Sequence, residues 1–129
     1  NIHTQDISDL TPWSGLTSLI ELRLAANSFT DLSPLRGLAT LEYLELTGND
    51  ITDITPLSGL TNLMQLDLRF NPELSNIQAL FENPGIGVGD VVELRHTNVS
   101  CTDQERLAEK GVEVRTEIFS SCATATRQR

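Results

Sequence analysis

The sequence predicts an α/β solenoid, a fold in which short coils of chain stack side by side. Three consecutive blocks of 22 residues, 7–28, 29–50 and 51–72, align without a gap. Within each block an apolar residue recurs at every third position, and the last step shortens to two. This spacing fits neither an α-helix nor a long strand, so each coil must turn one side chain inward at each corner and contain one short strand. A single coil cannot bury its own apolar edge, so neighbouring coils must stack.

The apolar positions define the expected core. Aromatic residues make up only 5% of the chain while leucine dominates, so the core should be aliphatic and repetitive. The positions are Ile7, Leu10, Trp13, Leu16, Leu19, Leu22 and Leu24 in the first block; Phe29, Leu32, Leu35, Leu38, Leu41, Leu44 and Leu46 in the second; and Ile51, Ile54, Leu57, Leu60, Leu63, Leu66 and Leu68 in the third.

Three polar or small columns keep the same register. An Asn three residues after each strand can turn inward and satisfy backbone groups that the bend leaves unpaired. A hydroxyl residue followed by Pro suits the N-cap and first position of a short helical turn on the outer side. A glycine then follows, which would relax that turn. In that order, the columns are Asn27, Asn49 and Asn71; Thr11-Pro12, Ser33-Pro34 and Thr55-Pro56; and Gly15, Gly37 and Gly59.

A fourth, longer repeat follows residue 72. It begins in phase with the third, and then Asn83-Pro84-Gly85 opens a longer loop before the apolar step resumes. Asn98 falls four residues after Leu94, where Asn71 falls three after Leu68, so an inward role for Asn98 stays open. The positions in phase are Leu74, Ile77 and Leu80 before the loop, and Val92 and Leu94 after it.

The composition changes at Ser100, and we expect repeats over 1–99, a C-terminal cap over 100–122 and a disordered polar tail over 123–129. Terminal caps cover the apolar edge of the last coil. The segment Thr102-Asp103-Gln104-Glu105 has the form of a capping box, with Thr102 and Glu105 satisfying free N–H groups reciprocally. The remaining cap elements are a helix to about Lys110 that stops at Gly111, and a closing strand containing Val112, Val114 and Ile118.

The other end is expected to lack a cap. A shift of 22 pairs Ile2 with Leu24 and Gln5 with Asn27, so the sequence starts in the middle of a strand. It opens on Asn1 without a signal-peptide pattern, which suits a processed product or an excised fragment.

Two stretches resemble known repeat families. The string LIELRLAANSFTDLSPLRGLATLEYLELTGNDITDITPLSGLTNLMQLDLRFN is similar to bacterial leucine-rich repeats of the 22-residue class, found in internalin-like surface proteins and in regulators of protein phosphatase one. The resemblance covers about residues 1–100 and implies a right-handed coil with short parallel strands on the concave face and 3₁₀ or irregular turns on the convex face. The string NIQALFENPGIGVGDVVELRHTNVSCTDQERLAEKGVEV resembles the last repeat and helix–strand cap of bacterial extracellular repeat proteins. Such families mostly bind proteins, but the motif names no partner.

Composition excludes several function classes. The formal net charge of −9 argues against nucleic acid and against an anionic membrane surface. No apolar run approaches the roughly 18 residues that span a bilayer. The two cysteines, Cys101 and Cys122, either form a disulfide or are buried thiols. A disulfide would indicate an oxidising compartment, and free thiols would favour the cytoplasm.

Other patterns are weak as sites. Gly85, Gly87 and Gly89 lack the strand–loop–helix setting and the Lys of a phosphate loop, and we expect an irregular loop there. His3 and His96 have no recurring ligand partners, and no catalytic arrangement of Ser, His, Asp or Cys appears. We therefore expect no enzymatic activity, no metal and no cofactor.

Two surface features have a local and a functional interpretation. Asp9, Asp31 and Asp53 occupy the same position in successive coils, and Asn76 continues this column. The column could bind calcium ions, but hydrogen bonds from these side chains to local backbone N–H groups are favoured. Asn98-Val99-Ser100 is a glycosylation sequon that matters only in a eukaryotic secretory pathway, and whether Asn98 is ever glycosylated stays open.

The strand face is the main candidate site. Side chains alternate along a strand, so those beside the inward leucines point outward. Three of the four basic residues before position 100 and the one Tyr lie there, and Tyr and Arg are enriched at interfaces. A plain solvated sheet is the alternative. The candidate partner-binding residues are Glu21, Arg23, Tyr43, Glu45, Gln65, Asp67, Arg69, Glu93 and Arg95, with Ala25, Thr47 and Val91 between them.

The sequence thus predicts a module that binds another protein through its concave strand face. We expect it to be extracellular, periplasmic or on the cell surface, as part of a longer chain or larger assembly. Two alternatives stay open: an intracellular regulatory subunit of the phosphatase type, and a structural subunit packed through its edges in a larger complex.

Overall fold

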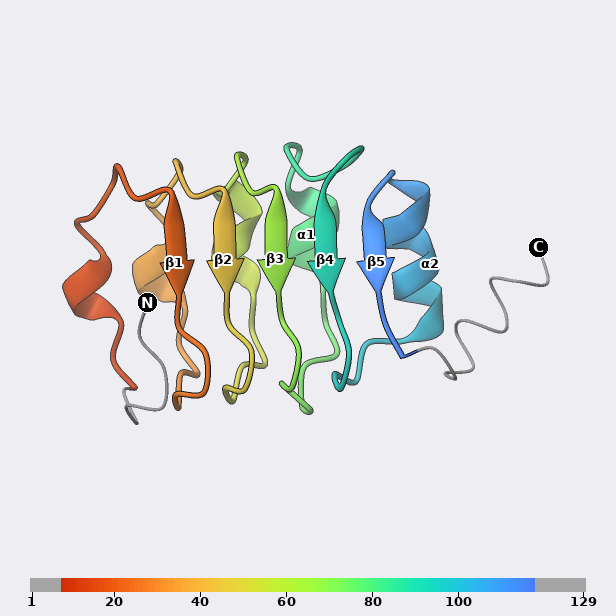
Figure 1. Ribbon diagram of the computed structural model, residues 1–129, viewed down its shortest axis with the longest axis horizontal. Helices are drawn as coiled ribbons and strands as arrows, with labels where there is room; N and C mark the ends of the chain where they lie inside the picture. Colours follow the sequence, from red (N-terminus) through yellow and green to blue (C-terminus); the bar gives the residue numbers. More distant parts are fainter. Residues whose placement is uncertain (1–7, 118–129) are drawn as a thin grey trace.

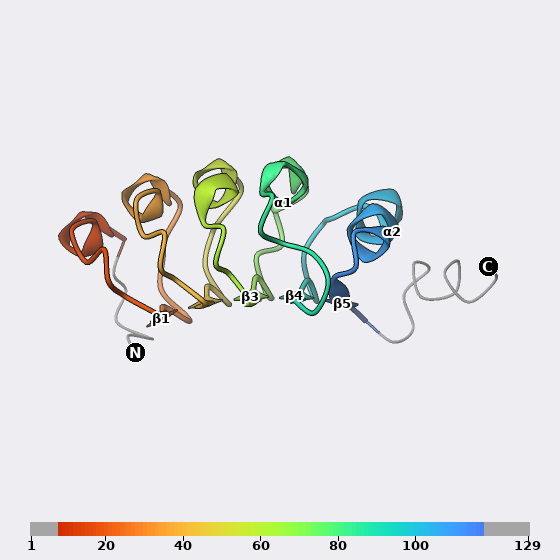
Figure 2. The ribbon, with the colours of Figure 1, turned by 90° about the horizontal axis from the view of Figure 1, so that it is seen from above.

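The computed structural model describes residues 8–117, which form a curved solenoid (Figure 1). Five strands make one parallel sheet in sequence order, and each of β1–β4 is followed by a bend and an outer helical turn or helix. Figure 2 shows the helical turns along the wider, outer arc and the strands along the inner arc, so the sheet is the concave face. The elements are η1 (Thr11–Trp13), β1 (Glu21–Arg23), η2 (Ser33–Leu35), β2 (Tyr43–Glu45), η3 (Thr55–Gly59), β3 (Gln65–Asp67), α1 (Gln78–Glu82), β4 (Val91–Glu93), α2 (Cys101–Glu109) and β5 (Glu113–Arg115).

The core consists of stacked aliphatic columns, as the period of three predicts. Leu22, Leu44 and Leu66 are paired across β1, β2 and β3, and all three are buried. Full burial of one such side chain contributes about 1.5–3 kcal/mol. Nearly every predicted inward position among the described residues is buried, so the cohesion of the fold comes from repeated aliphatic contacts between coils.

Leu16 is an exception to the predicted core. Its side chain is 47% exposed, whereas Leu38 and Leu60 in the same column are fully buried. Among the described residues, coils pack on Leu38 and Leu60 from both sides, but on Leu16 from one side only. Ile2, His3, Gln5 and Ile7, and with them the expectation of a mid-strand start, lie outside the described residues.

The predicted N-caps of the outer turns are wrong by one position. Thr11, Ser33 and Thr55 are the first helical residues, and the preceding Leu or Ile is the N-cap without a side-chain cap bond. The aspartate column supplies the missing acceptor instead. The Oδ1 atoms of Asp9, Asp31 and Asp53 each accept the backbone N–H two residues later at 2.9 Å, and Asn76 does the same for Gln78.

Hydrogen bonds from the hydroxyl and backbone of the residue two positions later lower the pKa of each of these three aspartates. This agrees with the local-backbone interpretation of the column. The described residues contain no group of three or more His, Cys, Asp or Glu side chains that could hold a metal ion.

The asparagine column lies inside the bends and joins each coil to the previous one. Asn49 Nδ2 donates to the carbonyl of Leu46 in its own coil at 2.9 Å and to that of Leu24 in the coil before at 3.0 Å. Its Oδ1 accepts the backbone N–H of Phe29 at 3.1 Å. Asn71 repeats this arrangement one coil later. Each asparagine therefore satisfies one backbone N–H and shares carbonyl acceptors with the asparagines of the neighbouring coils.

The register of the sheet shows that the fourth coil is four residues longer than the third. Gln65 pairs with Val91 on β4, whereas Tyr43 on β2 pairs with Gln65. The added length is taken up on the outer side and in the loop that follows α1. Buried Asn83 donates from Nδ2 to the carbonyls of Leu57 and Leu60 at 2.9 and 3.0 Å. A Cβ on Gly85 would lie 1.9 Å from the carbonyl oxygen of Thr61, so only glycine fits this approach.

Asn98 does not take the inward position in the fourth bend. Its side chain is exposed, and Thr97, which follows Leu94 by three residues, donates from Oγ1 to the carbonyl of Leu94 at 2.7 Å. The spacing from the strand therefore decides which residue turns inward.

The capping-box prediction for α2 is wrong. The helix begins at Cys101 with Ser100 as its N-cap, and the Ser100 hydroxyl accepts the N–H of Asp103 at 3.1 Å. The capping residue therefore precedes Thr102 by two positions. The end of the helix is as predicted, with Gly111 at φ +98°.

Helix α2 and strand β5 extend the stack by one more unit. β5 pairs in parallel with β4, and the Lys110 ammonium donates to the carbonyls of Leu80 and Asn83 at 2.7 and 2.6 Å, which ties α2 to the end of α1. Desolvation lowers the pKa of Lys110. Ile118, Cys122 and the tail 123–129 lie outside the described residues. Across 8–117, every helix is too short or too polar to cross a membrane.

The asparagine bridges predict a specific stability difference. Replacing Asn49→Ala leaves the buried N–H of Phe29 without an acceptor, which costs about 1–3 kcal/mol, and takes one of two amide donors from each of two buried carbonyls. We expect the urea midpoint of unfolding to fall clearly. Asp31→Ala is the control, because Asp31 is exposed and its partner Ser33 can bond to water. Equal midpoints for the two variants would contradict the structural role of Asn49.

Candidate binding face of the sheet

The strand face is the set of outward side chains on β1–β5, together with the second residue after each of β1–β4. Parallel pairing aligns them in rows that run across the coils. The backbone pairing continues past the ends of the strands. The N–H of Gly48 donates to the carbonyl of Arg69, and the N–H of Phe70 donates to the carbonyl of Arg95. The first row is Glu21, Tyr43, Gln65, Val91 and Glu113; the second is Arg23, Glu45, Asp67, Glu93 and Arg115; the third contains Ala25, Thr47, Arg69 and Arg95.

The centre of this face is an arginine layer over buried carboxylates. Asp67 and Glu93 point outward as predicted, yet their side chains are only 5% and 7% exposed, so they are not the solvated polar groups that the sequence suggested. Arg69 covers both. Its guanidinium makes a bidentate pair with Asp67 at 3.0 and 2.8 Å and contacts Glu93 Oε2 at 3.0 Å. The hydrogen bond with Asp67 raises the pKa of Arg69.

Glu93 is the common acceptor of the network. In addition to Arg69 it accepts from Arg95 Nη2 at 3.1 and 2.8 Å, and from Arg115 Nη1 at 3.4 Å. A carboxylate with three guanidinium partners fixes those partners in place. The result is a preorganised set of cationic side chains in the middle of the concave face.

The β1–β2 end of the face combines an aromatic ring with opposite charges. The Arg23 guanidinium lies over the Tyr43 ring, 4.6 Å from its centroid, and also pairs with Glu21 and, at 3.9 Å, with Glu45. Desolvation, with a further effect of the Glu45 charge, raises the pKa of Tyr43. Tyr43 therefore remains a neutral hydrogen-bond donor at ordinary pH.

Two aromatic residues at the far ends of β3 and β4 were missed by sequence reasoning. Phe70 and His96 have positive φ values of 59° and 60°, and their rings stack with centroids 4.4 Å apart at an interplanar angle of 20°. Gly48 holds the equivalent position one coil earlier, also with positive φ. That glycine was the available signal, because it marks a column in which the backbone is left-handed.

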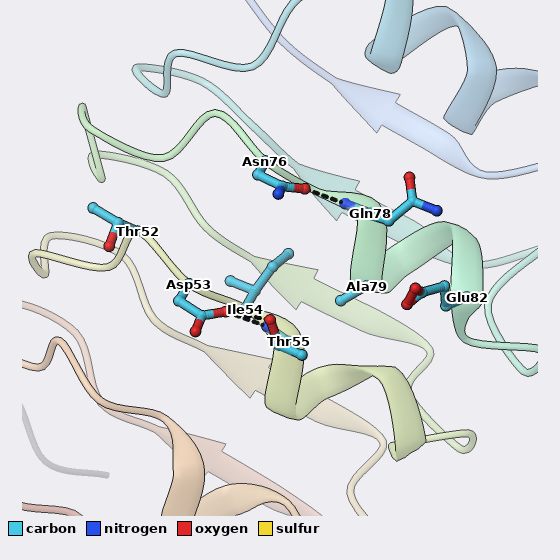
Figure 3. A pocket seen from close by; sticks show the side chains of 8 residues that line it. All are labelled: Thr52, Asp53, Ile54, Thr55, Asn76, Gln78, Ala79 and Glu82. Atoms are coloured by element: carbon cyan, nitrogen blue, oxygen red, sulfur yellow. Dashed lines mark hydrogen bonds between the residues drawn. The ribbon is translucent and has the colours of Figure 1, made fainter.

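A cleft on the convex side lies between η3 and α1 (Figure 3). It has a volume of about 310 Å³. Its most obvious ligand oxygens are already engaged, since Asp53 accepts from Thr55 and Asn76 from Gln78 (Figure 3). The residues that line it are Thr52, Asp53, Ile54, Thr55, Asn76, Gln78, Ala79 and Glu82.

Comparisons with known proteins agree with the fold. A family model described as "Leucine Rich repeats (2 copies)" matches residues 39–82. The crystal structure of internalin C2 from Listeria monocytogenes is similar with a TM-score of 0.73 and 32% identity, over 88% of this chain and 49% of that one. The internalin inlF of the same organism is similar with a TM-score of 0.72 and 27% identity, over 89% of this chain and 34% of that one. A comparison with curated protein sequences gave no match.

The chain is therefore a leucine-rich-repeat protein, and its repeats are of the bacterial, internalin-like class. This confirms the resemblance and the solenoid fold expected from the sequence. The chain spans about half of internalin C2 and about a third of inlF. The capping role of α2 and β5 stays a prediction.

The charge network predicts that Glu93 stabilises the protein more than an ordinary surface carboxylate. Glu93→Gln keeps the shape but leaves Arg69, Arg95 and Arg115 without their common counter-charge. Because these arginines are one third to one half exposed, we expect a loss of about 1–2 kcal/mol in the free energy of unfolding, measured in urea. The matched control is Glu42→Gln at an exposed position, which should change it by less than about 0.5 kcal/mol. A larger loss for the control would contradict the network.

Proposed function

We propose that this chain is a protein-interaction module that binds a partner protein through its concave strand face. The observation that carries the proposal is the preorganised arginine layer over Asp67 and Glu93 at the centre of that face. Side chains that are already fixed lose little conformational entropy when they bind, and this improves affinity. Arg and Tyr are also the residue types most enriched among energetic anchors of interfaces.

The fold supports binding rather than catalysis. A leucine-rich-repeat solenoid of the internalin type is typically an interaction module, and its curved sheet offers a long concave surface. The candidate residues proposed from the sequence meet on this surface: Tyr43 and Arg23 at one end, Asp67, Arg69, Glu93 and Arg95 in the middle.

We also propose that the module works outside the cytoplasm, in the cell envelope or as a secreted segment. The resemblance to internalins supports this location. The proposal includes a disulfide between Cys101, at the start of α2, and Cys122, which lies outside the described residues. Helix α2 and the segment after β5 would then be joined covalently, which suits a capping unit.

The binding proposal predicts which variants lose the partner. Tyr43→Ala and Arg69→Ala should each weaken binding by about 1–2 kcal/mol or more, because they remove an aromatic anchor on β2 and the central arginine that follows β3. The partner is first captured from the native source and identified by mass spectrometry, and its affinity for each variant is then measured by calorimetry. Thermal melts of the free variants separate lost contacts from lost folding.

Arg36→Ala is the control for this series. Arg36 is exposed and directly follows η2 on the convex side, away from the strands. It should bind the partner as the unchanged protein does. The opposite ranking would move the site to the convex side, and unchanged binding in all three variants would favour a subunit packed through its edges.

The disulfide proposal predicts that the unfolded, unreduced protein has no titratable thiol, and that reduction releases two. A bond over this span contributes on the order of 3 kcal/mol in the chain-entropy model, so reduction should also lower the unfolding midpoint. Two free thiols before reduction would overturn both the bond and the location outside the cytoplasm.

A further inference from the structure

We propose that the partner presents a carboxylate beside an apolar side chain, and that both dock on a corner formed by Arg69, Phe70, Arg95 and His96. These four residues are called the arginine–aromatic corner below. The inference rests on the proposed function, because it assumes that the strand face is the binding surface. It adds the chemistry of the partner and two anchors, Phe70 and His96, that sequence reasoning did not assign to binding.

The corner is one continuous patch because β3 and β4 are parallel and in register. Phe70 N–H donates to the carbonyl of Arg95 at 3.0 Å, so the pair 69–70 lies directly beside the pair 95–96. The two rings stack at 4.4 Å. The two guanidinium groups share the carboxylate of Glu93. A single short segment of a partner can therefore contact all four side chains.

The exposed charges of the corner select an anion. Asp67 and Glu93 are almost completely buried and already accept hydrogen bonds from arginines, so a cationic partner could not reach them. Arg69 and Arg95 retain exposed fractions of 34% and 42%, and their guanidinium groups form the outer layer. A partner that approaches these two arginines meets N–H donors first, and a carboxylate is their best-matched acceptor among protein side chains. The partly exposed Glu117 lies on the β5 side of the corner, with its Oε1 3.7 Å from His96 Nδ1.

Arg95 also has an unused donor. Its Nη2 holds both oxygens of Glu93, whereas its Nε is buried and has no acceptor among the described residues. A buried donor without a partner costs about 1–3 kcal/mol. If the Arg95 side chain turns outward on binding, a partner carboxylate can take Nε and Nη2 in a bidentate grip, and the bound state then recovers the cost of the unsatisfied donor.

The aromatic pair selects an apolar neighbour for that carboxylate. Phe70 is 51% exposed although it is one of only four phenylalanines in the chain. Its φ of 59° is unfavourable for a bulky side chain, and the small residues Ala26 and Gly48 hold the same left-handed position in the two preceding coils. An exposed ring stack next to arginines is the kind of surface that anchors partner residues.

The net charge of −9 does not prevent this contact. At physiological ionic strength charges are screened beyond about 8 Å, so the nearby guanidinium groups decide the local interaction. Long-range repulsion slows the approach of an acidic segment, and it keeps weak acidic partners from accumulating on the rest of the molecule.

A displayed library of random 12-residue peptides tests the inference on the full 129-residue chain. We expect the enriched peptides to carry Asp or Glu next to Phe, Trp, Leu or Ile. Their dissociation constants are then measured by fluorescence polarisation against Phe70→Gly, Arg95→Gln and Arg36→Gln. Phe70→Gly is chosen because glycine prefers this backbone conformation, so the variant removes the ring and keeps the fold. His96→Asn is a second variant of the same design, since Asn tolerates positive φ.

The corner variants Phe70→Gly and Arg95→Gln should each weaken binding at least tenfold, and Arg36→Gln by less than twofold. Enrichment of basic peptides, no enrichment at all, or full binding to both corner variants would overturn the inference. If peptide binding is lost in Tyr43→Ala while both corner variants bind normally, the strand face is the site and only the corner is wrong. If Arg36→Gln alone abolishes binding, the proposed function fails with it.

Discussion

Each strand of this solenoid ends in a tight bend, and the backbone groups of that bend would be unpaired without an inward side chain. Asn49 and Asn71 solve this by bonding to their own coil and to the one before it. Each Asn lies three residues after the inward leucine that follows its strand. This position sets the distance between consecutive coils and the register of the sheet. The aliphatic core supplies the cohesion between coils, but these bridges determine which residue lies beside which.

Constant register has a direct consequence on the concave side. Because the coils align strand by strand, equal positions form rows, and a charge on one strand faces its equivalent on the next. Asp67 and Glu93 are such neighbours, and two carboxylates side by side would repel each other. Arg69 spans both and removes the repulsion, which is why this row is stable although its acids are buried. The fourth coil preserves the rows despite its added length, because the insertion lies in its outer part, around Asn83 and Gly85.

The parts of the structure that the sequence predicts are those governed by repetition. The solenoid, the strands, the leucine core and the outward orientation of the face follow from period and alternation. Single positions are less predictable, because they depend on local competition. Ser100 rather than Thr102 caps α2, since the helix starts as soon as the Ser100 hydroxyl can accept the N–H of Asp103. The burial of Asp67 depends on the reach of Arg69 in three dimensions, which no linear spacing encodes. The stack of Phe70 on His96 joins residues 26 positions apart, across a coil whose length departs from the repeat.

These differences indicate where specificity lies in a repeat protein. Inward positions are constrained by stacking and are nearly the same in every coil, so they cannot distinguish one partner from another. Outward positions are free of that constraint and differ from coil to coil. Thr47 and Gly48 are followed one coil later by Arg69 and Phe70, and then by Arg95 and His96. The change replaces a small, neutral site with cationic and aromatic side chains while the backbone stays left-handed. Ala26 is also left-handed in this column, so the backbone conformation belongs to the scaffold. What Phe70 and His96 add is a stacked pair of exposed rings, and a contribution to binding is the physical reason for these side chains that we propose.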